Sequence, residues 1–149
     1  MSIRSLHCFV MLGLVLASVA GCTGPGPLRP IAEQAVSLNG RCEGTGQTGL
    51  RESSALTVTA NTVRALSWQV DGGPRGQCRF DLADFRQTRS RPHIELAARS
   101  GTGCRLMIWR DPRHITLSHA GCERQCPSGL LADALPVIFD PVSGGCAAS

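Results

Sequence analysis

The sequence predicts an all-β domain, a small antiparallel up-and-down barrel or sandwich of about seven short strands held together by disulfide bonds. Three observations predict it. Short segments alternate apolar and polar residues with period two, and turn residues separate these segments at close spacing. Eight cysteines occur in only 149 residues, a density typical of small exported domains.

The first 21 residues have the features of a secretory signal. Arg4 precedes an apolar stretch from Cys8 to Val19. At about a dozen residues this stretch is shorter than the roughly 20 needed to span a bilayer. We therefore expect residues 1–21 to be removed on export, and we exclude them from the fold.

The residues Val19-Ala20-Gly21-Cys22 resemble the lipobox of bacterial lipoproteins, in which a branched apolar residue and two small residues precede a cysteine. The resemblance implies that the Cys22 thiol carries diacylglycerol, and that the new amino terminus is acylated, for example with palmitate. Thr23 follows the cysteine where an inner-membrane retention signal has Asp, which implies anchoring to the outer membrane. The alternative is an ordinary cleaved signal with Cys22 as a structural cysteine.

Residues 22–36 are expected to form the lipidated end and a tether. Thr23–Pro30 contains three prolines and two glycines, which exclude a helix or a sheet ladder, and Ile31–Val36 could form a helical turn. The β domain is then expected over 37–149 and to face the periplasm.

Alternation and turn residues indicate strands near 38–43, 54–60, 63–70, 77–83, 93–98, 103–110 and 114–120. The clearest alternation runs from Leu66 to Val70, and again from Cys78 to Leu82 after a glycine-rich turn.

A second hairpin is predicted to turn at 111–113. We expect it to place Met107 and Trp109 on the same face as Ile115 and Leu117. In the tail, Gly129–Leu135 could form a brief helix, and Val137–Phe139 is an apolar run expected to dock on the sheets.

Six cysteines remain after Cys8 and Cys22, and an even number in an exported chain predicts three disulfides. The expected pairs are Cys42–Cys78, Cys104–Cys122 and Cys126–Cys146. The middle pair has the strongest basis, because a hairpin centred on Arg113 brings both cysteines opposite each other. The alternative joins Cys122 to Cys126 and Cys78 to Cys104.

Two clusters suggest chemistry at first sight. His114, His119, Cys122 and Cys126 superficially resemble a zinc site, but on a strand the two histidines face opposite ways. We expect no metal and no cofactor.

The run Ser100–Arg105 faintly resembles the catalytic motif of L,D-transpeptidases, with Gly101 at the serine position and Leu106 at the arginine position. Because these two positions depart from the motif, we expect no enzyme activity. The alternative is a peptidoglycan-modifying enzyme.

The candidate binding residues are Arg86, Arg89, Arg91 and His93, which lie within eight residues and are predicted to form a loop between two strands. Arginine binds phosphate and carboxylate groups through paired N–H donors. This loop is expected to bind an acidic envelope component or protein partner; the alternative is a solvated connection. The formal net charge of +4 is mild, and nothing favours nucleic acid.

The layout of lipid anchor, short tether and disulfide-bonded β domain is similar to the membrane-bound lysozyme inhibitors. In that family a Ser-Gly-x-x-Tyr loop enters the lysozyme cleft; here Ser100-Gly101 begins such a stretch, with Cys104 at the tyrosine position and no Tyr in the chain. The sequence thus favours a non-catalytic binding or inhibitory module. The alternative is an accessory or scaffold lipoprotein of an envelope assembly or secretion machine.

Overall fold

A computed structural model describes residues 34–46 and 48–147. The predicted signal, Cys22 and most of the tether lie outside the described residues. The described residues form nine strands, two more than the seven expected: β1 (Leu38–Thr45), β2 (Arg51–Thr59), β3 (Thr62–Asp71), β4 (Gln77–Asp81), β5 (Phe85–Arg89), β6 (Ile94–Ala98), β7 (Arg105–Arg110), β8 (Ile115–Ala120) and β9 (Val137–Phe139).

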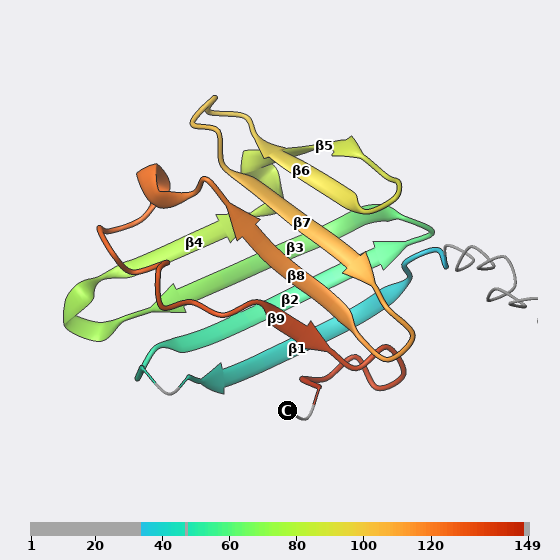
Figure 1. Cartoon of the computed structure of the whole chain (residues 1–149), viewed down its shortest axis with the longest axis horizontal. Helices are drawn as coiled ribbons and strands as arrows, with labels where there is room; N and C mark the ends of the chain where they lie inside the picture. The colour runs from blue at the N-terminus through green and yellow to red at the C-terminus, as the bar shows by residue number, and fades with distance from the viewer. Residues whose placement is uncertain (1–33, 47, 148–149) are drawn as a thin grey trace, which may run out of the picture. The chain divides into compact units, whose positions relative to one another are not determined.

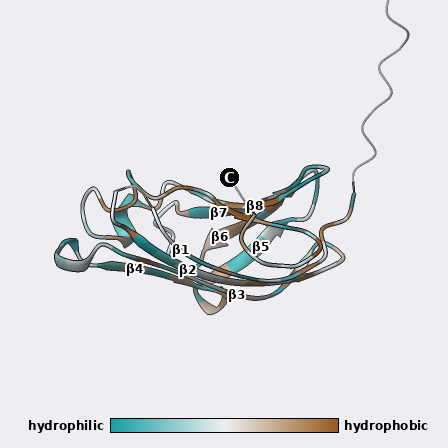
Figure 2. Ribbon diagram, turned by 90° about the horizontal axis from the view of Figure 1, so that it is seen from below, coloured by the Kyte–Doolittle hydropathy of each residue, from teal (hydrophilic) through white to brown (hydrophobic). Residues whose placement is uncertain are grey.

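Each strand pairs antiparallel with its neighbour in sequence, within two separate sheets. One sheet has the order β1-β2-β3-β4 and the other β5-β6-β7-β8-β9, and the 3₁₀ turn η2 (Leu82–Asp84) carries the chain between them. The sheets form two layers (Figures 1 and 2). They do not close into a barrel, so of the two predicted arrangements the sandwich is correct and the barrel is wrong.

The core lies between the two layers and follows the predicted alternation. In the first sheet Leu66, Trp68 and Val70 of β3 point inward, and in the second Leu106 and Ile108 of β7 do so; all five are 5% exposed or less. Burial of these faces supplies most of the stability, because each large apolar side chain contributes about 1.5–3 kcal/mol when removed from water.

The turn between β2 and β3 explains how the start of the domain is held. Ala60 and Asn61 both have positive φ, as a two-residue type I′ hairpin requires. Asn61 then pairs with Val36, accepting its N–H through Oδ1 at 2.6 Å and donating its own N–H to the Val36 carbonyl at 2.9 Å.

Strand β5 corrects the prediction of a single loop from Arg86 to His93. Arg86 and Arg89 lie in the strand, and only the residues from Ser90 to His93 form the connection to β6. This strand has little apolar alternation by which to predict it, because Phe85 is its one buried residue and an edge strand needs no apolar alternation.

The β7–β8 hairpin corrects the face assigned to Met107 and Trp109. Ile108 pairs with Leu117 and Trp109 with Thr116, one residue away from the predicted register. Asp111 sets this register, since its Oδ1 accepts the N–H groups of Arg113 and His114 at 2.8 and 2.9 Å. A slip of one residue moves every side chain to the other face, so Met107 and Trp109 lie on the outside.

Three disulfides join the six cysteines of the described residues, and one of them matches the predicted pairing. Cys104–Cys122 joins the ends of β7 and β8 with the Cα atoms 4.2 Å apart. It forms despite the changed register because Gly121, at a φ of 67°, inserts a turn before Cys122.

The other two predicted pairs are wrong, as is the local Cys122–Cys126 alternative. Cys42 is bonded to Cys146 and Cys78 to Cys126. Cys42 and Cys78 lie on β1 and β4, the two edges of one sheet. Two intervening strands separate them by roughly 14 Å, whereas a disulfide requires Cα atoms within about 7 Å.

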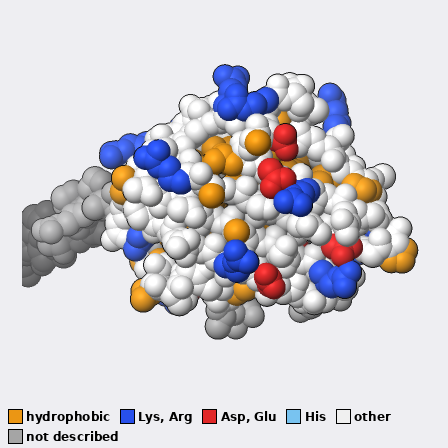
Figure 3. Space-filling view, turned by 180° about the vertical axis from the view of Figure 1, so that it is seen from behind, with side chains coloured by type: hydrophobic (Ala, Val, Ile, Leu, Met, Phe, Trp, Pro, Cys, Tyr) orange, Lys and Arg blue, Asp and Glu red, His pale blue; other side chains and the backbone are white. Residues whose placement is uncertain are grey.

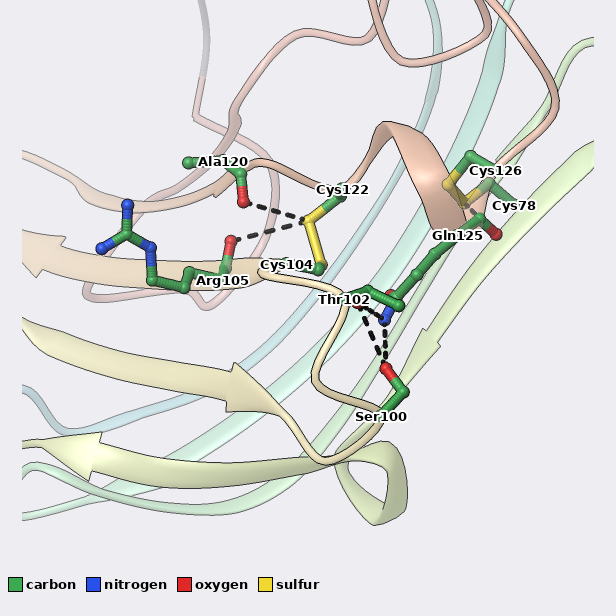
Figure 4. The surroundings of a disulfide bond; sticks show 9 residues. All are labelled: Cys78, Ser100, Thr102, Cys104, Arg105, Ala120, Cys122, Gln125 and Cys126. Carbon is green, nitrogen blue, oxygen red and sulfur yellow. Dashed lines mark hydrogen bonds between the residues drawn. A yellow bond between two sulfur atoms is a disulfide. The ribbon is translucent and has the colours of Figure 1, made fainter.

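The long connection from β8 to β9 is irregular, and residues 129–135 form turns in place of the predicted helix. The 3₁₀ turn η3 (Glu123–Gln125) holds it against the β6–β7 loop: Gln125 Nε2 donates to Thr102 Oγ1 at 2.7 Å and to Ser100 Oγ at 3.1 Å (Figure 4). As predicted, the run Val137–Phe139 docks, adding β9 to the second sheet. None of the described residues belongs to a helix that could cross a membrane.

Candidate functional site

The predicted binding residues lie at the free edge of the second sheet. Arg86 and Arg89 on β5, and Arg91 in the following connection, are all exposed, while His93 is half-buried. Among the described residues none of the three arginines forms an ion pair with a carboxylate. Their guanidinium groups are therefore free to bind an external anion. We call these three residues the basic rim.

A hollow of about 290 Å³ adjoins the basic rim. Pro92 and His93 from the β5–β6 connection, and Met107 and Trp109 from β7, line it. Trp109 is 37% exposed, which is high for so large an apolar side chain. Tryptophan, methionine and arginine are the residue types enriched at protein interfaces. We call this feature the Trp109 hollow.

A further arginine extends the same face. Arg86 pairs across the sheet with Ala97, and Ala97 pairs with Arg105, so the two arginines share a face with one small residue between them. Strands lie about 4.8 Å apart, which puts their Cα atoms roughly 10 Å apart. Arg105 is exposed and, because it lies on a distant strand, sequence spacing could not group it with Arg86.

One carboxylate lies between the basic rim and the hollow. Glu95 accepts a hydrogen bond from Thr88 Oγ1 at 3.2 Å, and its Oε2 lies 3.9 Å from His93 Nε2. Its side chain is only 15% exposed, so Glu95 orients His93 and Thr88 more than it neutralises the exposed arginines.

Gln87 fixes the edge strand that carries the basic rim. Its side chain accepts the Val63 N–H at 3.1 Å and donates to the Asn61 carbonyl at 2.7 Å, which ties β5 to the β2–β3 turn of the other sheet. A binding surface on a held strand loses less conformational entropy when a partner binds than one on a free loop.

The outer face of the first sheet is different in character. There basic and acidic side chains are interspersed (Figure 3), and two arginines are already paired: Arg51 with Asp71 at 2.6 Å and Arg79 with Asp81 at 2.7 Å. Arg41 and Arg64 on this face are exposed and form no ion pair among the described residues, but neither lies on the sheet that carries the exposed Trp109.

The residues that superficially resemble a zinc site do not converge. Cys122 and Cys126 belong to two different disulfides, His119 packs against Trp68 inside the sandwich, and His114 lies 3.7 Å from Asp111 at the β7–β8 turn. Within 34–46 and 48–147 there is no group of three or more side chains placed to hold a metal ion.

The Ser100-Gly101 loop is held in place and contains no protruding aromatic residue. Gln125 binds Ser100 and Thr102, and Cys104, at the position of the inhibitors' tyrosine, is 1% exposed in its disulfide. The same disulfide leaves Cys104 without the free thiol that a transpeptidase nucleophile requires.

The interior contains one polar arrangement that the sequence did not indicate. Trp68 Nε1 donates to Glu52 Oε2 at 3.2 Å, and the Trp68 ring lies 5.5 Å from that of His119 on the opposite sheet. Burial raises the pKa of Glu52, although the hydrogen bonds from Trp68 and the Leu135 backbone oppose this effect. Burial also lowers the pKa of His119, and the charge of Glu123 partly offsets that shift.

We expect Glu52→Gln to stabilise the domain at neutral pH and to have no effect in acid. Because the folded-state pKa of Glu52 lies above its ordinary 4.5, the stability gained by protonating Glu52 is complete below that value and is lost as pH rises through the folded pKa. Urea unfolding at pH 4 and pH 7 tests this, since His119 titrates in both proteins and cancels in the difference. If the wild type and Glu52→Gln have the same free energy of unfolding at pH 7 as well as at pH 4, the prediction is wrong.

The fold and the site together define the class: a disulfide-bonded, two-sheet β domain with a basic and aromatic face at one sheet edge. No protein-family model matches the chain, and neither does any curated protein or solved structure in the comparisons. What the domain does must therefore be argued from its own residues.

Proposed function

We propose that this chain is a lipid-anchored, non-catalytic binding module of the bacterial cell envelope, and that it recognises an anionic partner through the basic rim and the Trp109 hollow. The observation that carries the proposal is the juxtaposition of three exposed, unpaired arginines with a hollow containing an exposed tryptophan. Phosphate groups of lipid A, carboxylates of peptidoglycan and an acidic protein surface all offer the matching charge.

The two halves of this surface would contribute differently to binding. A single exposed ion pair contributes only about 0–1 kcal/mol, so the arginines must act together on a cluster of anionic groups. The apolar hollow would supply affinity that does not depend on salt, as buried aromatic side chains do at the centres of protein interfaces.

Removing the basic rim should weaken partner binding strongly without unfolding the domain. We expect the triple variant Arg86→Ala, Arg89→Ala and Arg91→Ala to bind its partner at least about tenfold more weakly. Wild-type binding should also weaken as salt rises. Binding of the purified domain to lipopolysaccharide, to peptidoglycan and to proteins crosslinked in cells provides the measurement.

The matched control removes three arginines from the other face, with Arg41, Arg64 and Arg79 each changed to alanine. It has the same net charge as the rim variant and should keep its binding. Trp109→Ala should weaken binding by a factor that does not change with salt. If the rim variant binds as the wild type does, or if both triple variants lose binding equally, the rim is not the site.

Lipid anchoring through Cys22 is tested separately. Cys22→Ala should abolish incorporation of a clickable palmitate analogue in cells and release the domain from membranes, because the thiol is the attachment point for diacylglycerol. Failure of the wild-type chain to incorporate the label would contradict anchoring, and sucrose-gradient fractionation would test the outer-membrane assignment.

A further inference from the structure

A second hollow lies at the far end of the first sheet, away from the basic rim and independent of the function proposed above. Glu52 points to the inner face of β2, like Ser54 and Leu56 beyond it. It is the one inward-facing charged residue of that strand, and no ion pair links it to a cationic side chain in the described part of the chain.

The space beside Glu52 is open. A cavity of about 230 Å³, which Glu52 lines, lies between the end of β1 and the segment 135–138. A second cavity of about 350 Å³ lies at the same end of the sheet but on its outer face, among Glu43, Ser53 and Asp71. Gly44 faces Glu52 across the β1–β2 pair, and a Cβ added at Gly44 would meet no atom within 4 Å. Absence of a side chain at Gly44 therefore keeps the approach to the carboxylate open.

The wall opposite Glu52 is apolar and partly exposed. Leu135 and Pro136 border the smaller cavity and are exposed, Leu135 by 66%, and the Cys42–Cys146 disulfide also lines it. Exposed large apolar side chains beside a half-buried carboxylate offer two kinds of contact to one ligand: charge at one end and apolar surface along its length.

We propose that this hollow binds an alkylammonium group, with the ammonium on the Glu52 carboxylate and the alkyl chain along Leu135 and Pro136. Trp68 Nε1 already donates a hydrogen bond to Oε2 of Glu52, but a carboxylate has further lone pairs that can accept the ammonium N–H donors. Burial would make such a charge-assisted hydrogen bond stronger than on an open surface. A lysine side chain of a partner and a free small amine share this chemistry.

Titration of n-butylammonium into the ¹⁵N-labelled domain, in an amine-free phosphate buffer, tests the proposal. The two tryptophans give two indole N–H signals. The Trp68 signal should shift with saturation at millimolar ligand, because its N–H is bound to the same carboxylate, while the Trp109 signal on the outer face of the other sheet should not. Trp109→Phe assigns the two signals.

Four comparisons separate a carboxylate site from weak apolar association. n-Butanol, which has the alkyl chain without the charge, should bind at least about tenfold more weakly, and so should n-butylammonium to the Glu52→Gln variant. Gly44→Leu should block binding by filling the approach, whereas Glu43→Gln, in the larger cavity, should change affinity less than twofold.

Binding should also weaken as pH falls and Glu52 becomes protonated. Glu43, Arg51 and Asp71 lie at the same end of the sheet but on its outer face, where Arg51 and Asp71 pair with each other. On the inner side, His119 of β8 packs against the Trp68 ring. A lysine-containing tripeptide with blocked ends distinguishes the two sources: tighter binding than n-butylammonium indicates a protein partner, and weaker binding a free amine.

The proposal is overturned if the Trp68 signal does not shift, or if n-butanol shifts it at the same concentrations as n-butylammonium. It is also overturned if binding survives unchanged in a folded Glu52→Gln variant. Should that variant not fold, the n-butanol comparison and the Gly44→Leu variant decide the matter. The rim triple variant should bind n-butylammonium normally, so failure at one site is separable from failure at the other.

Discussion

Replacing Trp68 with alanine is expected to lower the free energy of unfolding by about 3–5 kcal/mol, the usual cost of removing a large buried aromatic side chain. Trp68 is completely buried, and its ring lies 5.4 Å from that of Phe80 and 5.5 Å from that of His119. It therefore connects the two sheets as well as packing within one. Since a domain of this size is stable by about 5–15 kcal/mol in total, the variant should be close to unfolding.

The chain supplies a matched control for this prediction. Trp109→Ala makes the same chemical change on the outer face and should cost well under half as much. Trp68→Phe keeps most of the packing but removes the N–H that binds Glu52, and so separates the two contributions. Urea unfolding followed by circular dichroism measures all three, and a loss at Trp68 no larger than that at Trp109 would contradict the central role of Trp68.

The second large effect is expected from the outermost disulfide. Changing Cys42 and Cys146 together to serine should lower the free energy of unfolding by about 4 kcal/mol, and changing Cys104 and Cys122 together by about 3 kcal/mol. The order follows from loop size, since the sequence separations are 104 and 18 residues. A larger closed loop restricts the unfolded chain more.

The difference between these two pairs is small because the disulfides are nested. Cys42–Cys146 encloses Cys78–Cys126, which encloses Cys104–Cys122. The inner bridges shorten the path, so the outermost bridge closes a loop of only roughly 60 residues while they are intact. Urea unfolding of the paired serine variants, each with the other two bridges confirmed by non-reducing peptide mapping, measures the order. If removing the innermost disulfide lowers the free energy of unfolding more than removing the outermost one, loop size does not set the order.

The sequence by itself was sufficient for the fold class and most strand positions. Alternation from Leu66 to Val70 and from Cys78 to Phe80 depends only on the two-residue period of a strand, and those residues are buried as that period requires. The Cys104–Cys122 disulfide could also be predicted, because a hairpin brings nearby residues together independently of the rest of the chain.

Features that depend on contacts between distant parts of the chain could not be predicted from local sequence patterns. The two wrong disulfide predictions joined cysteines that are close along the chain. Cys42 and Cys146 meet instead because β1 and the carboxy-terminal segment lie side by side, where Arg41 donates its N–H to the Gly144 carbonyl at 2.9 Å. The face of Trp109 depended on a single residue of register set by Asp111.

The two candidate sites divide along the same line. Three arginines of the basic rim were found from sequence because they are close in the chain, but Arg105 and Trp109 join them only through cross-strand pairing. Glu52 could not be predicted as a site residue, since only its contacts with Gly44, Trp68 and Leu135, each from a different segment, distinguish its position. Local periodicity determines which residues form strands, whereas the order and register of strands determine which side chains meet.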